Sequence, residues 1–352
     1  GATGGPLRFA PGRLARYRNQ ELQHEFAACV LGAEVFRWRR APGPPPRLRV
    51  ELAVASPGRG DAATLPLELC RVTEPVRSVS FCSSPLYSLT KMQRQVPWAV
   101  DDWLEYHLGH VQFDYGEVYD LDGSLAEVLG PVRLEQFLRR GLRYRPHWGS
   151  NLSTSITSLS QRHPYCGETF AYADCLTTHR ALSRWVMLLH SPDEYVVAPR
   201  RQEERGVLKV IADYERGAPV GQPMQMMGVR ASSFARGDGG GAAGGSAAAR
   251  SSANGRGHVI LDSRSRCDLR YRHTPVFDPA MCVCAGPHTC YAEANTEFAG
   301  RMMDIEPEDL VVHHYVELLP GNAGRCAQQH RDCGVPDATA DHVVAMLQSR
   351  KL

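Results

Sequence analysis

Short apolar runs alternate with polar stretches along the middle of the chain, and the spacing of the apolar residues predicts the elements. Residues 76–82 and 184–189 are compact apolar runs typical of buried strands. Residues 101–108 and 168–183 are more polar and carry helical character. This alternation, which continues to about residue 215, predicts an α/β fold with a mainly parallel sheet.

Weaker patterns predict further helices, loops and strands of the chain. Residues 124–140 have helical character, and Gly130-Pro131 predicts an interruption within them. Residues 83–95 follow the first core strand and are expected to form a loop. Further strands are expected over residues 27–35, 48–54, 113–119 and 142–144.

Shifts in composition divide the chain into three parts. Residues 1–70 are basic at first, rich in Gly and Pro, and expected to be poorly ordered or peripheral. Residues 71–320 carry the alternating pattern and form the expected main domain, and residues 321–352 form a carboxyl-terminal extension. Within the domain, the Gly/Ala/Ser run 237–257 is expected to be a flexible insertion. Because long surface insertions cost little free energy, it does not require a second domain.

Charge and cysteine content limit the partners and the compartment. The 352 residues include 40 basic and 38 acidic side chains, a net charge of +2 that gives no reason to expect nucleic acid as a partner. Eleven cysteines indicate an oxidising compartment. The chain has no signal-peptide pattern and no run of 18 apolar residues, and it begins with Gly1. We therefore expect any membrane anchor to lie outside this sequence.

The apolar run 184–189 ends in an unusual group of polar residues, His190-Ser191-Pro192-Asp193-Glu194. Carboxylates at the end of a buried strand cost free energy unless they are hydrogen-bonded or contact a cation. Ligands of α/β sheets also bind just beyond the carboxyl ends of such strands. A plain turn formed by Pro192 is the alternative, and the local residues alone favour it.

The surroundings of this group resemble glycosyltransferase family 92, which includes plant galactan galactosyltransferases. The likeness begins with Asp174-Cys175-Leu176 and continues through His179-Arg180, Trp185-Val186 and Asp193-Glu194-Tyr195, in the order of the family pattern DCLxRHRxxAxWVxFxDxDEF. Ser191 stands where the family has the first Asp of its Asp-x-Asp motif. Three weaker likenesses extend the resemblance from about residue 76 to 317, at residues 103–120, 285–288 and 310–317. The last of them carries Val316 in place of the Arg of the family's HHYR motif.

The resemblance implies an activity and a location. It implies a GT-A fold that transfers a sugar, with galactose expected, from a UDP-sugar to a glycan or polysaccharide acceptor with inversion. It also implies a type II membrane protein of the Golgi lumen. A divalent cation, expected to be Mn²⁺, would stabilise the leaving diphosphate as a Lewis acid.

The metal ligands expected from this likeness are Asp193, His314 and His288. Since His313 and His314 alternate in a strand-like run, only one of them can face the site. For each histidine, a structural role is the competing interpretation.

The expected contacts to the donor nucleotide come from five residues: Asp120, Asp122, Arg180, Asp193 and Glu194. For Asp120 and Asp122 an Asp-rich turn is the favoured alternative, and for Arg180 a solvated helix face is as good an interpretation. An inverting transfer also needs a general base. Asp304, Glu306 and Glu317 are available, and nothing in the sequence selects one, so the catalytic residue stays unassigned.

Two further interpretations compete with an active transferase. An inactive relative that binds a glycan or a partner is favoured by Ser191 and Val316. A disulfide-rich extracellular interaction module would instead place Asp193 and His314 far apart. The late cysteines could also form a zinc cluster, but they lack paired C-x-x-C spacing, so short-range disulfides explain them better. These cysteines are Cys282, Cys284, Cys290, Cys326 and Cys333.

Overall fold

The structure is a computed structural model that divides the chain into two compact units, Gly1–Pro75 and Val76–Leu352. The first unit is described through the backbone of four strands. The second is described over residues 77–150, 164–180, 182–219, 224–235, 265–282, 284–286, 288–291, 301–315 and 335–336. The predicted insertion 237–257 and most of the predicted extension 321–352 lie outside the described residues, as does Glu317.

The first unit contains two antiparallel hairpins. The predicted strand at 48–54 is found, and residues 27–29 of the strand predicted at 27–35 form the end of a strand, while residues 30–35 lie outside the described residues. The strands that pair with these two, at residues 14–19 and 62–69, were not predicted. The four strands are β1 (Leu14–Asn19), β2 (His24–Cys29), β3 (Leu48–Ala55) and β4 (Ala62–Leu69).

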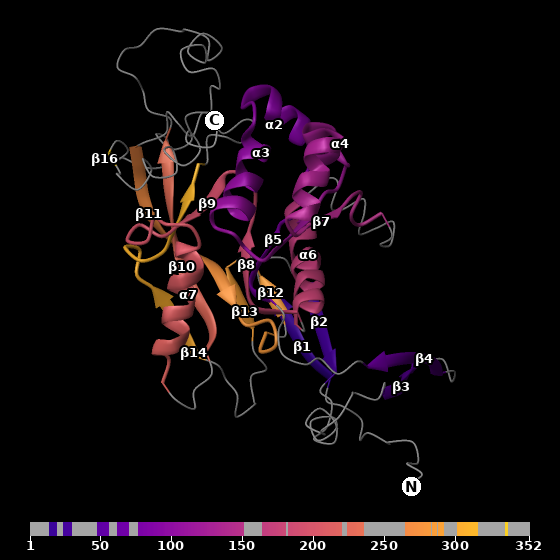
Figure 1. The fold of residues 1–352 in the computed structure, drawn as a ribbon. Coiled ribbons are helices and arrows are strands. Elements are labelled where there is room, and N and C mark those ends of the chain that lie inside the picture. The colour runs from indigo at the N-terminus through magenta and orange to yellow at the C-terminus, as the bar shows by residue number, and fades with distance from the viewer. Residues whose placement is uncertain are drawn as a thin grey trace. The chain divides into compact units, whose positions relative to one another are not determined.

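The second unit is built on one mixed sheet of ten strands (Figure 1). Its main path runs β7-β6-β5-β8-β11-β10-β15-β9, while β14 pairs with β10 and β16 pairs with β11. The strands are β5 (Arg77–Ser83), β6 (Tyr115–Tyr119), β7 (Leu142–Arg145), β8 (Ser183–Leu189), β9 (Glu194–Val197), β10 (Met224–Ala235), β11 (Ser265–Phe277), β14 (Arg301–Ile305), β15 (Val311–His314) and β16 (Val335–Pro336).

Both parallel and antiparallel pairs occur in this sheet. Strands β5, β6, β7 and β8 are all parallel to their neighbours among themselves. Strand β11 then pairs antiparallel with β8 and β10, and β9 pairs antiparallel with β15. The predicted α/β class is therefore confirmed, but the sheet is mixed rather than mainly parallel. A separate small hairpin joins β12 (Cys284–Gly286) to β13 (Thr289–Tyr291).

The described helices overlap the three predicted helical stretches, and two further helices, α2 and α7, were not predicted. The predicted loop 83–95 ends in a helix, α2, because Leu89 and Met92 bury one face of a short helical turn. The predicted interruption of α4 is confirmed at Gly130, whose φ of 70° is not helical. The helical elements are α2 (Leu89–Gln95), α3 (Ala99–Leu104), the π-helical turn η1 (Glu105–His110), α4 (Ser124–Arg139), α6 (Pro164–His179) and α7 (Gly206–Gly217).

Strand β8 is buried on both faces, which explains its unbroken apolar sequence. Trp185, Met187 and Leu189 belong to a core that also contains residues of α2, α3, α4 and α7. The alternate residues Val186 and Leu188 face a second core, formed with α6. This burial on two sides requires the apolar residues of a central strand at every position.

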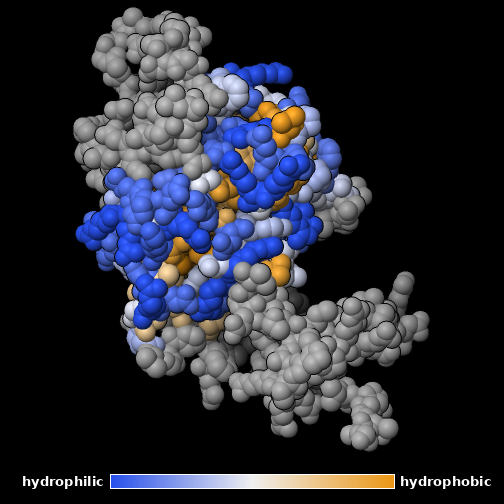
Figure 2. Space-filling view, in the orientation of Figure 1, coloured by the Kyte–Doolittle hydropathy of each residue, from blue (hydrophilic) through white to orange (hydrophobic). Residues whose placement is uncertain are grey.

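The described surface is mainly polar. On the face drawn in Figure 2, hydrophilic residues predominate and apolar residues form small separate patches. The most exposed large apolar side chains of the described residues are Val132 and Met302, at 73% and 59% exposure. None of the described helices has both the length and the apolar character needed to cross a membrane.

Candidate functional site at the carboxyl edge of the sheet

The parallel strands β5, β6 and β8 deliver three polar segments to one edge of the sheet. The chain leaves these strands at Ser84, Asp120 and His190, and hydrogen bonds join the segments. The N–H of Ser84 donates to the carbonyl of His190 at 3.2 Å, and Leu86 forms an isolated parallel bridge with Asp120. This edge is where an α/β sheet binds its ligands.

Asp193 and His314 meet at this edge because β9 and β15 pair in a defined register. Glu194 lies opposite His314 in that antiparallel pair, and the N–H of Tyr315 donates to the carbonyl of Asp193 at 2.8 Å. The Nε2 atom of His314 then lies 3.0 Å from Oδ2 of Asp193. If the chain were an interaction module, Asp193 and His314 would be expected to lie far apart. They lie in contact instead.

The carboxylate of Asp193 is fully buried, and both of its oxygens have partners. Its Oδ1 accepts a hydrogen bond from the hydroxyl of Ser191, and its Oδ2 contacts His314. Burial alone would lower the pKa of His314, but the negative charge of Asp193 outweighs it and raises that pKa. His313 faces the other side of the sheet, where its ring centroid lies 4.4 Å from that of Phe234. Only one of the two histidines reaches the site, as strand alternation predicts.

A second pair of charged residues, His190 and Glu194, lies directly beside the first. The Nδ1 atom of His190 is 2.9 Å from Oε1 of Glu194, and the backbone N–H of His190 donates to Oε2 at 2.7 Å. The indole of Trp103 fixes the strand start by donating to the carbonyl of Glu194 at 2.9 Å. Burial would lower the pKa of His190, yet the Glu194 charge raises it to about 9. Burial would likewise raise the pKa of Glu194, but His190 holds it at about 2.

His190 was not among the predicted site residues. Its position after the last apolar residue of a central strand, four residues before Glu194, is the signal that could have identified it. The Nε2 atom of His190 and the hydroxyl of Tyr172 are buried and have no hydrogen-bond partner among the described residues. The two rings lie 6.2 Å apart, centroid to centroid. Buried polar groups without partners are uncommon and often face a ligand or water.

His288 reaches the same edge from the turn after β12. Its ring centroid lies 5.5 Å from that of His190, which places His288 beside the second pair. The structure thus brings Asp193, Glu194, His288 and His314 together, in two adjacent groups.

Asp120 and Asp122 reach this edge too, but the backbone occupies both carboxylates. Asp120 accepts from the N–H groups of Gly123 at 3.0 Å and Leu125 at 2.9 Å, and from the hydroxyl of Tyr144 at 2.8 Å. Asp122 accepts from the N–H groups of Ser88 and Ser124, at the starts of α2 and α4. Both aspartates therefore satisfy N–H groups that have no partner within the helices. These hydrogen bonds fit the interpretation of Asp120 and Asp122 as an Asp-rich turn better than their interpretation as contacts to a ribose.

Arg180 lies away from this edge. It follows α6 and precedes Ser183, the first residue of β8, whereas His190 follows the last residue of that strand. Its guanidinium donates to the carbonyl of Cys282 at 2.8 Å and that of Pro279 at 3.4 Å. The structure gives Arg180 a role in holding the turn after β11 and does not bring it to Asp193. Of the general-base candidates, Asp304 and Glu306 are exposed on and after β14, and nothing in the structure selects either.

No protein-family model matches the chain, and no curated protein matches it. The interpretation of the site therefore depends on its geometry and on the resemblance seen in the sequence.

Asp193 and His314 form a hydrogen-bonded pair, and the separation of their atoms would also suit two neighbouring metal ligands. Bonds of about 2.1 Å in an octahedral site place adjacent ligand atoms about 3 Å apart. The Asp193 and His314 atoms have that separation, 3.0 Å. An ion held there would have two protein ligands, so a diphosphate and water would need to supply the other positions. Carboxylate oxygen and imidazole nitrogen suit Mn²⁺.

Proposed function

We propose that the chain is a GT-A-type glycosyltransferase that transfers a sugar from a UDP donor to a glycan or polysaccharide acceptor. Galactose is the leading candidate for the sugar, and inversion is the expected outcome. The observation that carries the proposal is the contact between Asp193 and His314 at the carboxyl edge of parallel strands. The resemblance to family 92 supports it, because that resemblance named both residues as metal ligands.

The roles proposed for the residues follow from their contacts. Asp193 and His314 would hold Mn²⁺, which when bound supplies a Lewis acid for the leaving diphosphate. Glu194 orients the ring of His190 through Nδ1, which directs the buried Nε2 atom away from the pair. A charged imidazole held in this way can donate a strong hydrogen bond to a phosphate oxygen. Asp120, Asp122 and Arg180 have structural partners and are left out of the proposed donor site.

The proposed location is an oxidising compartment, the Golgi lumen. The buried disulfide between Cys82 and Cys175 supports this choice.

An inactive, glycan- or partner-binding relative is the second candidate. The observation that favours it is the hydrogen bond from Ser191 to Asp193. Where the family has a carboxylate, this chain has a hydroxyl that occupies one oxygen of the remaining Asp. This removes one negative charge from the site and should weaken its hold on a free cation.

Calorimetric titration of UDP-galactose with and without Mn²⁺ tests the proposal. We expect metal-dependent binding in the wild type and its loss in Asp193→Ala and His314→Ala. Glu308→Ala is a matched control, because it removes an exposed carboxylate in the turn after β14, and it should bind as the wild type does. Ser191→Asp should strengthen the metal dependence. Wild-type protein that binds neither the sugar nucleotide nor the metal would refute the donor site and favour the inactive relative.

A further inference from the structure

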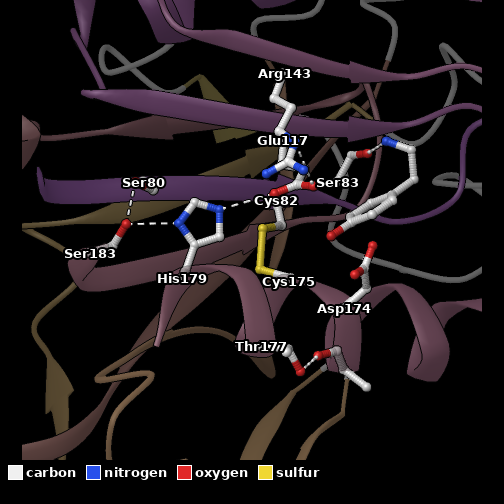
Figure 3. The surroundings of a disulfide bond; sticks show 12 residues. Ser80, Cys82, Ser83, Glu117, Arg143, Asp174, Cys175, Thr177, His179 and Ser183 are labelled. Carbon is white, nitrogen blue, oxygen red and sulfur yellow. Dashed lines mark hydrogen bonds and ion pairs between the residues drawn. A yellow bond between two sulfur atoms is a disulfide. The ribbon is translucent and has the colours of Figure 1, made fainter. Parts of the chain in front are cut away.

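A second group of metal-ligating side chains lies on the α6 side of the sheet (Figure 3). Cys82 is on β5, and Glu117 lies beside it on β6, because these two residues are partners in the parallel register. Cys175 and His179 are four residues apart on α6, a spacing that puts both side chains on one face of the helix. All four side chains are fully buried.

The donor atoms of this group converge. The sulfur atoms of Cys82 and Cys175 and a ring nitrogen of His179 lie within 4.8 Å of one another, the only such group of three among the described residues. The carboxylate of Glu117 approaches from β6, with its Oε2 atom 3.3 Å from Nε2 of His179. These last two atoms are buried, and neither has a hydrogen bond of good geometry.

The ring of His179 is held as metal-binding histidines are held. Its Nδ1 atom lies 2.7 Å from the hydroxyl of Ser183, which lies 2.8 Å from the hydroxyl of Ser80 (Figure 3). The other nitrogen, Nε2, is directed toward Glu117. A hydrogen bond to one ring nitrogen that fixes the orientation of the other is the usual support of an imidazole ligand.

The charge around the group also suits a cation with two thiolates. Zn²⁺ with two thiolates, one carboxylate and a neutral imidazole has a net charge of −1. The guanidinium of Arg145 donates to Oε1 of Glu117 at 2.7 Å and supplies the missing positive charge. Two more charged groups lie near it and offset each other, Arg143 at 3.7 Å from Glu117 and Asp174 at 3.9 Å from Arg145. A buried site of this composition would therefore be neutral overall, which avoids the large cost of burying net charge.

We propose that the disulfide is one of two states of this group, and that the reduced chain binds Zn²⁺ through Cys82, Cys175, His179 and Glu117. A dithiol reductant supplies two electrons and two protons and becomes a disulfide itself, while the bond between the two cysteines breaks to give two thiols. Zn²⁺ then binds the thiolates and releases both thiol protons to solvent.

The backbone geometry permits both states. The Cα atoms of the two cysteines are 6.3 Å apart, within the range of a disulfide. A tetrahedral ion with Zn–S bonds of 2.3 Å needs the sulfurs about 3.8 Å apart, which side-chain rotation can supply. The inference does not depend on the proposed transferase activity, since none of the four residues belongs to the Asp193 edge.

Cobalt binding to the purified chain tests this inference, because Co²⁺ is a coloured substitute for Zn²⁺. The oxidised chain should bind no Co²⁺ at this group. After reduction with dithiothreitol and its removal without air, one equivalent should give thiolate-to-cobalt charge transfer and the visible bands of a tetrahedral ion. Zn²⁺ should then displace the Co²⁺. The reduced Cys175→Ser variant should lose these bands, and Glu117→Gln should bind Co²⁺ roughly 10-fold or more weakly.

Two further measurements keep the result interpretable. Cys282 is also buried and disulfide-bonded, so reduced Cys282→Ser is the matched control and should keep the full spectrum. If Cys175→Ser does not fold, X-ray absorption at the zinc edge of the reduced wild type needs no variant and should show two sulfur and two lighter neighbours. Four sulfur neighbours, no binding after reduction, or an unchanged spectrum in folded Cys175→Ser would each overturn the inference.

Discussion

Replacing His190 with Gln should remove a large part of the pH dependence of stability above neutrality. In the folded chain the charge of Glu194 raises the pKa of His190 to about 9, against a usual value of 6.5. Because this pKa is raised on folding, the stabilisation is complete below about pH 6.5. It is lost as the pH rises through about 9. The side chain of His190 is only 17% exposed, so solvent screens the pair weakly.

The magnitude follows from the two pKa values of His190. A difference from 6.5 to about 9 corresponds to about 3 kcal/mol of unfolding free energy, at 1.36 kcal/mol for each pKa unit. The wild type should therefore be more stable than His190→Gln by about 3 kcal/mol near pH 6, and this gap should nearly close at about pH 10.

Urea unfolding of both proteins across this pH range measures the gap. His314 also has a raised pKa, which the charge of His190 lowers, so the comparison is repeated in a His314→Gln background, where this coupling is absent. His147→Gln is a control for the replacement of an exposed histidine, because His147 is exposed in the turn after β7. A gap between the wild type and His190→Gln that stays constant from about pH 6 to about pH 10 would refute the ion pair.

Three substitutions elsewhere test the described contacts through unfolding free energies. Gly116→Ala should cost about 1–3 kcal/mol, since its Cβ would lie 2.3 Å from a ring carbon of Phe81 in a packed core, and a cost below about 0.5 kcal/mol would contradict that packing. Asp120→Ala should cost about 1–3 kcal/mol by leaving buried donors without an acceptor, while metal-dependent binding of UDP-galactose at the other carboxylates persists; loss of binding in a stable variant would return Asp120 to the donor site. Val132→Ser should change stability by less than about 0.5 kcal/mol because this side chain is exposed on α4, and a larger loss would indicate a contact not described above.

The elements of the second unit could be predicted wherever a local sequence pattern was sufficient to identify the element. Strand β8 was predicted because burial on both faces requires an unbroken apolar run, and the break in α4 was predicted from Gly130-Pro131. Helix α2 was missed because a helix of seven residues buries only two side chains, and this leaves too little periodicity to detect.

The mixed character of the sheet could not be predicted for a different reason. Strands β10, β11 and β15 find their neighbours across long stretches of chain, and local periodicity does not encode which strands pair. The same limit applies to the candidate site. The sequence named Asp193 and His314 separately, but only the register of β9 against β15 puts them in contact. Cys82 and Cys175, which are 93 residues apart, could not be paired by spacing either.

Charge balance at the carboxyl edge bears directly on how an ion would be held. Two of the carboxylates at this edge, Asp193 and Glu194, each contact a histidine with a raised pKa. The carboxylates of Asp120 and Asp122 accept hydrogen bonds from the backbone, and Ser191 stands where the family pattern has a further carboxylate. A site with so little uncompensated negative charge attracts a free cation weakly, whereas a sugar nucleotide brings its own negative diphosphate. We therefore expect Mn²⁺ to bind measurably only together with the nucleotide. Tight binding of Mn²⁺ alone would show that this charge balance is wrong.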